Sequence, residues 1–503
     1  MGHLPYHLEE ERKRIWELAC AVGLDCYETI FEMVTYDQMN QFAAYGGFPV
    51  RYPHWRFGME YDKLSKSYEY GLSKIYEMVI NNDPCYAYLM EGNRTVDQKL
   101  VMAHVYGHCD FFKNNKWFEP TDRKMMNTMA NHATRIRRYM DRYGVDAVED
   151  FIDKCLSIEN LIDRYAPYSP SKVDKRQEKQ DQTRKALLKF DREYMDEYVN
   201  PDHRHEFEPK EEDDRMAKVP ERPERDVLLF LMHHAPLKHW QQDVLSIIRN
   251  EAYYFAPQGM TKIMNEGWAS YWHSKLMTES IMTDSEVIDY ADACAGTLAM
   301  SPMGFNPYKI GIELFRNIEE RWNKGQFGLE WSQCDDIAEK KAWNTDAGLG
   351  REKIFQVRRD YNDVTFIDEF LTEEFCVENK MFVYKFNQRS GRYEVDTRQF
   401  PLVKQQLLFQ LTNFGQPIIH VENANFNNRG ELLLNHLFEG VEIQYNYAQE
   451  TLKNLFAIWK RPVNLLTVID EKQKILRHDG TELKTIDVLA ESQVKSAEES
   501  TGS

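Results

Sequence analysis

Two histidines, His104 and His108, stand four residues apart in the stretch MAHVYGHCDFFKNN. Apolar residues recur at three- and four-residue spacing through residues 96–112, which predicts a helix. On a helix both imidazoles would project from one face about one turn apart, where their nitrogens can reach a single cation. This spacing alone also occurs in packed helices that bind no metal, so a further ligand must come from elsewhere in the chain.

The segment IMNEGWASYWHSKLM offers that ligand, because Glu266 and His273 lie seven residues apart and hence on one face of an apolar helix. A carboxylate and an imidazole are costly to bury there unless they are paired or bind a metal. We therefore predict one divalent metal ion on His104, His108 and Glu266, with a buried hydrogen-bonded His and Glu network as the alternative. This donor set suits Zn, Mn and Fe(II), and zinc is the leading candidate.

A catalytic metal would also need groups that manage protons and hold a substrate. His273 and Glu251 are the candidate catalytic residues, although His273 as a fourth ligand would make the metal structural. Asp110, two residues after His108, is predicted to orient an imidazole. Five polar residues are predicted to contact substrate, and each could equally be a turn or capping residue: His54, Asn114, Asn115, Gln258 and Thr261.

Two helical regions must position these residues. Residues 1–165 form the first helical part of the body, and residues 227–375 form the second part, which completes the metal site. In the second part, prolines 236 and 257 are expected to end helices, and a further helix is expected from Pro307 to Gly325. Residues 166–226 are rich in charged residues, which predicts a solvated helix followed by a linker. His203 and His205 are expected to be exposed loop residues of this segment.

Short strands interleaved with two helices indicate a different architecture in residues 380–480. The expected strands are 381–386, 392–397, 417–423, 430–437 and a hairpin over 464–477, with helices at 401–413 and 447–459. This order predicts a small α+β domain of the ferredoxin-like kind, followed by a disordered tail over residues 481–503. The predicted fold class is therefore mainly α, a large helical body followed by a small α+β domain.

Composition excludes several classes of partner. The net charge of -18 and pI near 5.4 oppose binding to nucleic acid or to an anionic membrane surface. No apolar stretch is long enough to span a bilayer, and the N-terminal residues lack the apolar core of a secretory signal. The eight cysteines form no C-x-x-C pair. We expect a cytoplasmic protein with reduced thiols and neither a nucleic-acid nor a membrane partner.

The metal motif resembles that of gluzincin metallopeptidases. These enzymes carry H-E-x-x-H on one helix and a third glutamate ligand on a later helix, in some cases within E-G-W-A-x-Y, which stands here at residues 266–271. The resemblance implies a zincin-like body, ligands at His104, His108 and Glu266, and a fourth position open to water. Val105 stands where the general-base glutamate would be, so the standard peptidase mechanism does not carry over.

Longer strings resemble the SpoVR (stage V sporulation protein R) family, in order and over roughly residues 5–480: YPHWRFG at 52–58, AHVYGHCDFFKNN at 103–115, APLKHWQQDVLSIIR at 235–249, PQGMTKIMNEGWASYWH at 257–273 and NPYKIGIELFRNIEERW at 306–322. The resemblance implies a bacterial cytoplasmic protein of a family named for spore cortex formation. We expect a metal-dependent hydrolase acting on an amide bond in a peptide-like or cell-wall-related substrate. The alternative is a non-catalytic regulatory or scaffold protein with a structural metal, whose C-terminal domain binds a protein partner.

Overall fold

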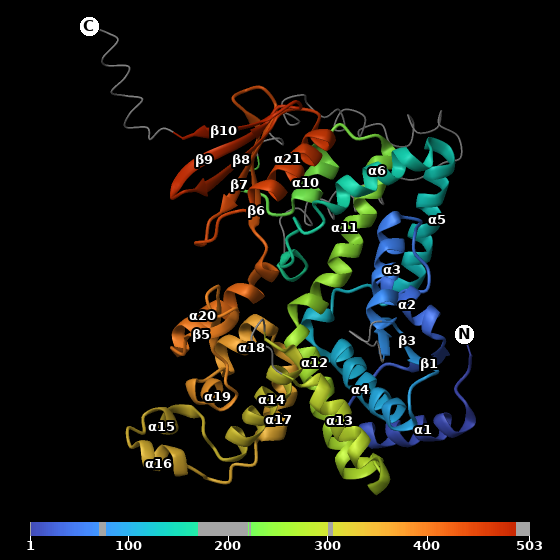
Figure 1. Cartoon of the computed structure of the whole chain (residues 1–503), viewed down its shortest axis with the longest axis vertical. Coiled ribbons are helices and arrows are strands. Elements are labelled where there is room, and N and C mark those ends of the chain that lie inside the picture. Colours follow the sequence, from blue (N-terminus) through green and yellow to red (C-terminus); the bar gives the residue numbers. More distant parts are fainter. Residues whose placement is uncertain (1, 70–76, 170–219, 221–222, 300–304, 489–503) are drawn as a thin grey trace, which may run out of the picture. The chain divides into compact units, whose positions relative to one another are not determined.

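The computed structural model describes residues 2–69, 77–169, 220, 223–299 and 305–488 (Figure 1). His203, His205 and most of the predicted linker lie outside the described residues. The chain forms two compact units, one made of Met1–Arg142 and Tyr254–Gln416, the other of Tyr143–Tyr253 and Pro417–Ser503. Each unit combines segments that are far apart in the sequence. The domains predicted from the sequence were instead consecutive stretches of the chain.

The first unit is mainly helical, as the spacing of its apolar residues predicted. Its N-terminal segment contains α1 (Tyr6–Ala21), α2 (Tyr36–Ala44), α3 (Trp55–Glu69) and α4 (Thr95–Asn114), and α5 (Met125–Tyr143) begins in it. Its second segment contains α12 (Lys262–Leu276), α13 (Val287–Thr297), α14 (Pro307–Asn323), α17 (Gly350–Asp360), α18 (Asp363–Phe370) and α20 (Phe400–Leu411). The two segments share one hydrophobic core, to which α4, α12 and α14 contribute most of their apolar residues.

Three short strands in the first unit were not expected from the sequence. They are β1 (Thr29–Val34), β2 (Glu77–Ile80) and β3 (Cys85–Met90), in the order β1-β3-β2, with β1 parallel and β2 antiparallel to β3. The side chain of Gln98, in the first turn of α4, donates a hydrogen bond of 2.7 Å to the carbonyl of Met90 at the end of β3. The sheet therefore fixes where the histidine-bearing helix begins.

The helix α11 (His239–Met260) differs from the expectation that Pro257 would end a helix, because it continues through this proline. Proline removes one backbone N–H donor from a helix. The break falls instead at Thr261, whose hydroxyl donates a 2.7 Å hydrogen bond to the Pro257 carbonyl. The next helix, α12, takes its N-terminal cap from a distant residue: Asp363 accepts hydrogen bonds from the backbone N–H groups of Ile263 and Met264 at 2.8 and 2.9 Å.

The second unit contains the five-stranded mixed sheet of the C-terminal region. Its strands are β6 (Ile418–Phe426), β7 (Glu431–Leu437), β8 (Val463–Ile469), β9 (Lys472–His478) and β10 (Leu483–Asp487), in the order β10-β9-β8-β7-β6. Only β7 and β8 are parallel, and α21 (Tyr445–Trp459) connects them, as a parallel pair requires. The helices α6 (Val145–Leu156) and α10 (Val227–His234) belong to the same unit.

The sheet corrects two expectations. The predicted strands at 381–386 and 392–397 exist as β4 (Val383–Asn387) and β5 (Arg392–Thr397), but they form a separate hairpin in the first unit, so the ferredoxin-like arrangement is wrong. Residues Leu483–Asp487, expected in a disordered tail, pair with β9. Residues 489–503 lie outside the described part of the chain.

Two expectations drawn from composition can be compared with the structure. All eight cysteines are free thiols, and four of them are buried: Cys85, Cys109, Cys155 and Cys376. Within the described ranges, none of the helices is both long enough and apolar enough to cross a lipid bilayer.

Candidate metal centre

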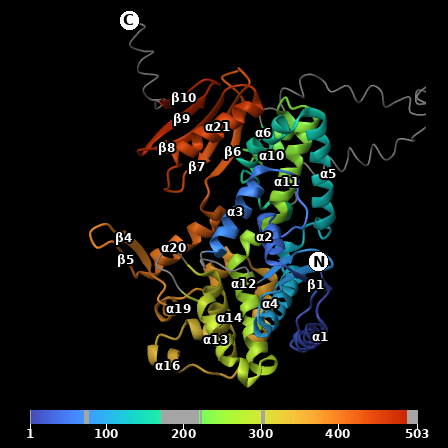
Figure 2. The ribbon, with the colours of Figure 1, turned by 45° about the vertical axis from the view of Figure 1, so that its right-hand side comes forward.

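Helix α12 packs closely against α4 on one side and α14 on the other (Figure 2). A Cβ atom on Gly107 of α4 would lie 2.6 Å from the Cα of Ala269 in α12. A Cβ atom on Gly267 would lie 2.4 Å from the Cα of Gly311 in α14. Because glycine has no Cβ, the backbones can approach to distances that other residues would forbid. This approach brings the histidine face of α4 next to Glu266.

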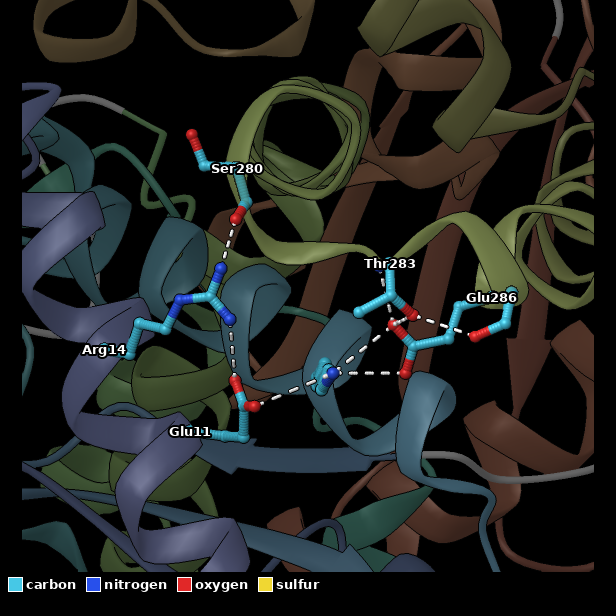
Figure 3. A network of polar contacts seen from close by, with 7 residues as sticks. Glu11, Arg14, Ser280, Thr283 and Glu286 are labelled. Atoms are coloured by element: carbon cyan, nitrogen blue, oxygen red, sulfur yellow. Dashed lines mark hydrogen bonds and ion pairs between the residues drawn. The ribbon is translucent and has the colours of Figure 1, made fainter.

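A network of polar contacts holds the N-terminal half of α4 in place (Figure 3). The Lys99 Nζ, on a buried side chain, lies 3.1 Å from Glu286 Oε1 and 3.7 Å from Glu11 Oε1. Arg14, on α1 with Glu11, lies 3.4 Å from the Glu11 carboxylate and also donates to the backbone carbonyl of Ser280. The network therefore ties α4 to α1 and to the segment that follows α12.

The two imidazoles and the carboxylate converge as the sequence predicted. The Nε2 atoms of His104 and His108 each lie 3.5 Å from Glu266 Oε2. All three side chains are buried, with 4% to 6% of each residue exposed. One ligand atom from each residue lies within 4.8 Å of the other two. These three residues could therefore hold one metal ion.

The other nitrogen of each imidazole is occupied by a partner from α12. His104 Nδ1 lies 2.8 Å from His273 Nδ1, and His108 Nδ1 lies 2.9 Å from Asn265 Oδ1. An amide oxygen only accepts hydrogen bonds, so His108 carries a proton on Nδ1, which leaves Nε2 as the nitrogen that could bind a cation. A hydrogen bond that fixes the tautomer in this way is typical of metal-binding histidines.

The carboxylate of Glu266 is charged but incompletely satisfied. Lys262 donates to its Oε1 at 2.5 Å. Its Oε2 is buried and accepts no hydrogen bond of normal geometry from the described residues. Burial alone would raise the pKa of Glu266, but the imidazoles of His104 and His108 outweigh it and hold this pKa well below its usual range.

These features fit a divalent cation better than a hydrogen-bonded network. A buried charged oxygen without a hydrogen-bond donor is costly, and a cation between Glu266 Oε2 and the two Nε2 atoms would remove that cost. The donor set is neutral imidazole and carboxylate, which does not single out zinc. Among the described residues, no fourth His, Cys, Asp or Glu joins the group.

A cavity of about 780 Å³ opens beside the centre. His104, His273 and Ser270 line it, together with Tyr308 and apolar residues of α4, α13 and α14. The Ser270 hydroxyl is buried, and no hydrogen-bond partner for it is found among the described residues. Burial lowers the pKa of His273 well below its usual range, and the neighbouring imidazoles lower it further, so this side chain is neutral.

Asp110, predicted to orient an imidazole, instead joins α4 to other elements. Its carboxylate accepts hydrogen bonds of 2.8 Å from the Asp25 backbone N–H and from Trp268 Nε1. Arg358 Nε lies 3.5 Å from the same carboxylate. Burial raises the pKa of Asp110 to about 6. The atoms that face the imidazole Nδ1 positions belong to His273 and Asn265, and Asn265 was missed by sequence reasoning.

The remaining predicted site residues have other positions. Glu251 is buried and belongs to the second compact unit, so its catalytic assignment stays a prediction. The five predicted substrate-contacting residues are not among the described residues that line the cavity. His54 accepts a hydrogen bond from Arg56 N, Thr261 donates to Pro257, and Gln258 lies on α11. Asn114 donates to Asp25 and Asp110, and Asn115 donates to the carbonyls of Arg358 and Tyr361.

Fold and site together define a mainly helical protein with a buried His-His-Glu group that could hold a metal ion. The chain belongs to the SpoVR-like family, because the family model described as SpoVR like protein matches residues 4–416. It is 31% identical over 468 residues to the YcgB protein of Escherichia coli (strain K12), with 87% of each chain covered. No solved structure matches the chain.

Proposed function

We propose that this protein is a metal-dependent hydrolase that cleaves an amide bond in a peptide-like or cell-wall-related substrate. The observation that carries the proposal is the position of the buried, unsatisfied Glu266 Oε2, which faces two imidazole Nε2 atoms at 3.5 Å beside a cavity. Three protein ligands with one position left open are typical of catalytic metal sites, whereas structural sites are closed by four. A bound divalent cation would supply Lewis acidity, which polarises a carbonyl group and activates water.

Two side chains at the cavity wall, His273 and Ser270, could donate hydrogen bonds to a substrate. When His104 binds a cation through Nε2, its Nδ1 carries the proton and donates to His273 Nδ1. His273 must then carry its own proton on Nε2, which makes it a hydrogen-bond donor toward a substrate and not a general base. The Ser270 hydroxyl is a second donor at the cavity wall. Val105 is fully buried and supplies no base, so deprotonation of water requires another group.

The family supports the rest of the proposal. Its name refers to sporulation, which favours a cell-wall precursor as the substrate and the bacterial cytoplasm as the location. Zinc is the metal we propose, since it is the commonest cation on two histidines and one glutamate in hydrolases. The five-stranded sheet of the second unit would then serve to bind a protein partner.

The rival function is a non-catalytic scaffold with a structural metal, and the absence of a base at Val105 favours it. To separate the two, the purified chain would be analysed for bound metal and assayed against amide-containing peptides and cell-wall muropeptides, with and without chelator. The His104→Ala variant should lose both metal and activity, while His273→Ala should stay folded, bind metal more weakly than the wild type, and lack activity even when metal is added to saturation. The exposed Lys453→Ala, in the second unit, serves as the control.

Three outcomes would reject the hydrolase proposal. The first is a protein free of metal after gentle preparation, which would favour the alternative of a buried hydrogen-bonded His and Glu network. The second is stoichiometric metal with no chelator-sensitive cleavage of any substrate. The third is a His273→Ala variant that loses metal and folded structure together, which would favour the scaffold.

A further inference from the structure

A second cavity, of about 920 Å³, shares no lining residue with the cavity beside His104. Helix α17 and the residues before it form most of its wall. Four cationic side chains line it, Arg351, Lys353, Arg358 and Arg359, against one acidic residue, Glu352. In a chain with a net charge of -18 this is a local reversal of sign. We infer that this pocket binds a phosphate group carried by a small molecule.

Two of the cations are held in place by aromatic rings. The Arg351 guanidinium carbon lies 4.6 Å from the centre of the Trp272 ring, and Lys353 Nζ lies 5.0 Å from that of Trp322. Such contacts restrict the movement of the cation. Arg351 also donates a hydrogen bond to the Val22 carbonyl, and no other hydrogen bond from its guanidinium is found among the described residues. A positively charged group that is already positioned loses less entropy when it binds an anion.

Arg358 is the most informative of the four. It is 7% exposed, and its Nε has no hydrogen-bond partner among the residues that the structure describes. The nearest carboxylate oxygen, Asp110 Oδ2, lies 3.5 Å away, which is beyond a good hydrogen bond. A buried guanidinium with an unused donor at the wall of a pocket is costly, and an anionic oxygen would satisfy it. Arg359 is different, because both of its bonds of 3.2 Å go to Asp360.

The start of α17 adds to the positive potential. Gly348 and Leu349 line the pocket directly before the helix, whose N-terminus carries a partial positive charge. Phosphate oxygens are well suited to a site that combines a helix N-terminus with guanidinium groups. The pocket is larger than one phosphate ion requires, so a nucleotide-sized ligand can also enter.

The test is a calorimetric titration of the full-length, metal-loaded protein with inorganic phosphate and with AMP, using sodium chloride and sodium acetate at matched ionic strength as controls. We expect saturable binding of phosphate or AMP and none of chloride or acetate. Similar affinities for both would identify free phosphate as sufficient, and tighter binding of AMP would identify a nucleoside phosphate.

Variants locate the site. Losing one charge-assisted contact should weaken binding about tenfold or more in Arg351→Gln, Lys353→Gln and Arg358→Gln. Lys453→Gln, an exposed lysine with the same change of charge, should bind like the wild type. Arg358→Gln leaves Asp110 without a cation, so circular dichroism must first establish that this variant folds. If it does not fold, Lys353→Gln still tests the site, because the Lys353 Nζ donates only to Gln356 among the described hydrogen bonds.

Two results would overturn the inference. One is that neither phosphate nor AMP binds above the level of chloride and acetate. The other is binding that is equally tight in the Arg351, Lys353 and Lys453 variants, which would place the anion elsewhere.

Discussion

The Nδ1 atoms of His104 and His273 face each other at 2.8 Å inside the protein. Two nitrogens at this distance share one proton, so the protonation of one ring dictates that of the other. A cation on His104 Nε2 keeps the His104 proton on Nδ1, so His104 Nδ1 donates the hydrogen bond and His273 Nδ1 accepts it. His273 would thus act on a metal bound at this site through His104.

Replacing His273 by leucine should therefore weaken metal binding about 10- to 100-fold, as loss of an orienting hydrogen bond does at other metal sites. His273→Gln, whose amide oxygen can accept the same bond, should recover much of the affinity. Competition with a chromogenic chelator would measure both dissociation constants. Equal affinities in the wild-type and leucine proteins would show that His273 does not orient the ligand.

The crossing of α4 and α12 leads to a second prediction. Gly107→Ala would place a Cβ atom 2.6 Å from the Ala269 Cα, so the helices must separate. We expect a loss of stability of about 1–3 kcal/mol, as for overpacked cores, together with weaker metal binding. Gly58→Ala in α3 is the matched control, because its Cβ would meet nothing within 4 Å. Urea unfolding should rank Gly107→Ala well below Gly58→Ala, and equal midpoints would contradict the close approach.

Lys99 provides a test of the network in Figure 3. Lys99→Met should leave the partly buried Glu286 carboxylate without its cation and Glu11 with Arg14 alone. Removing one partner of a fully buried ion pair costs about 3–5 kcal/mol, and the partial exposure of both carboxylates reduces our expectation to roughly 2 kcal/mol. Lys66→Met, which breaks an exposed pair with Asp62, should change the unfolding free energy little. Indistinguishable unfolding curves for the two variants would show that the ion pairs of Lys99 do not help to hold α4 in place.

The candidate metal ligands were predictable because their spacing is local. His104 and His108 need only one regular helix to share a face, and Glu266 stands in a motif with a known resemblance. Their orienting partners were not predictable in the same way. Asn265 precedes Glu266 in the sequence, but its role depends on how α12 is rotated against α4, which no local pattern specifies. Its amide, unusual on an apolar helix, was the available signal.

For the fold too, the individual elements could be predicted from the sequence, whereas their tertiary assembly could not. Every strand and helix expected in 380–480 exists, because short strands and helices differ in period. Their assembly was wrong, since nothing in β4 or β5 indicates that they leave the later strands for the first unit. The strands β1 and β3 were missed because short apolar runs such as CYAYLM fit a buried helix as well as a strand.

The cap of α12 yields a prediction on pH. Asp363 is fully buried, and burial raises its pKa to about 7 even though it accepts hydrogen bonds from Ile263 N and Met264 N. In the unfolded chain an aspartate has a pKa of about 3.9. Between these values the folded protein binds more protons than the unfolded chain, so the free energy of unfolding falls as pH rises. The slope from this one group is at most about 1.4 kcal/mol per pH unit.

Asp363→Asn cannot titrate and should lose this slope, whatever its own stability. Urea unfolding of both proteins at several values from about pH 5 to pH 8 would give the difference between their unfolding free energies, in which the contributions of all other groups cancel. We expect the wild type to lose stability relative to Asp363→Asn as pH rises toward 7, and the difference to level off above that value. Parallel curves across the range would mean that Asp363 is already ionised in the folded protein, and that the backbone N–H groups at the start of α12 outweigh its burial.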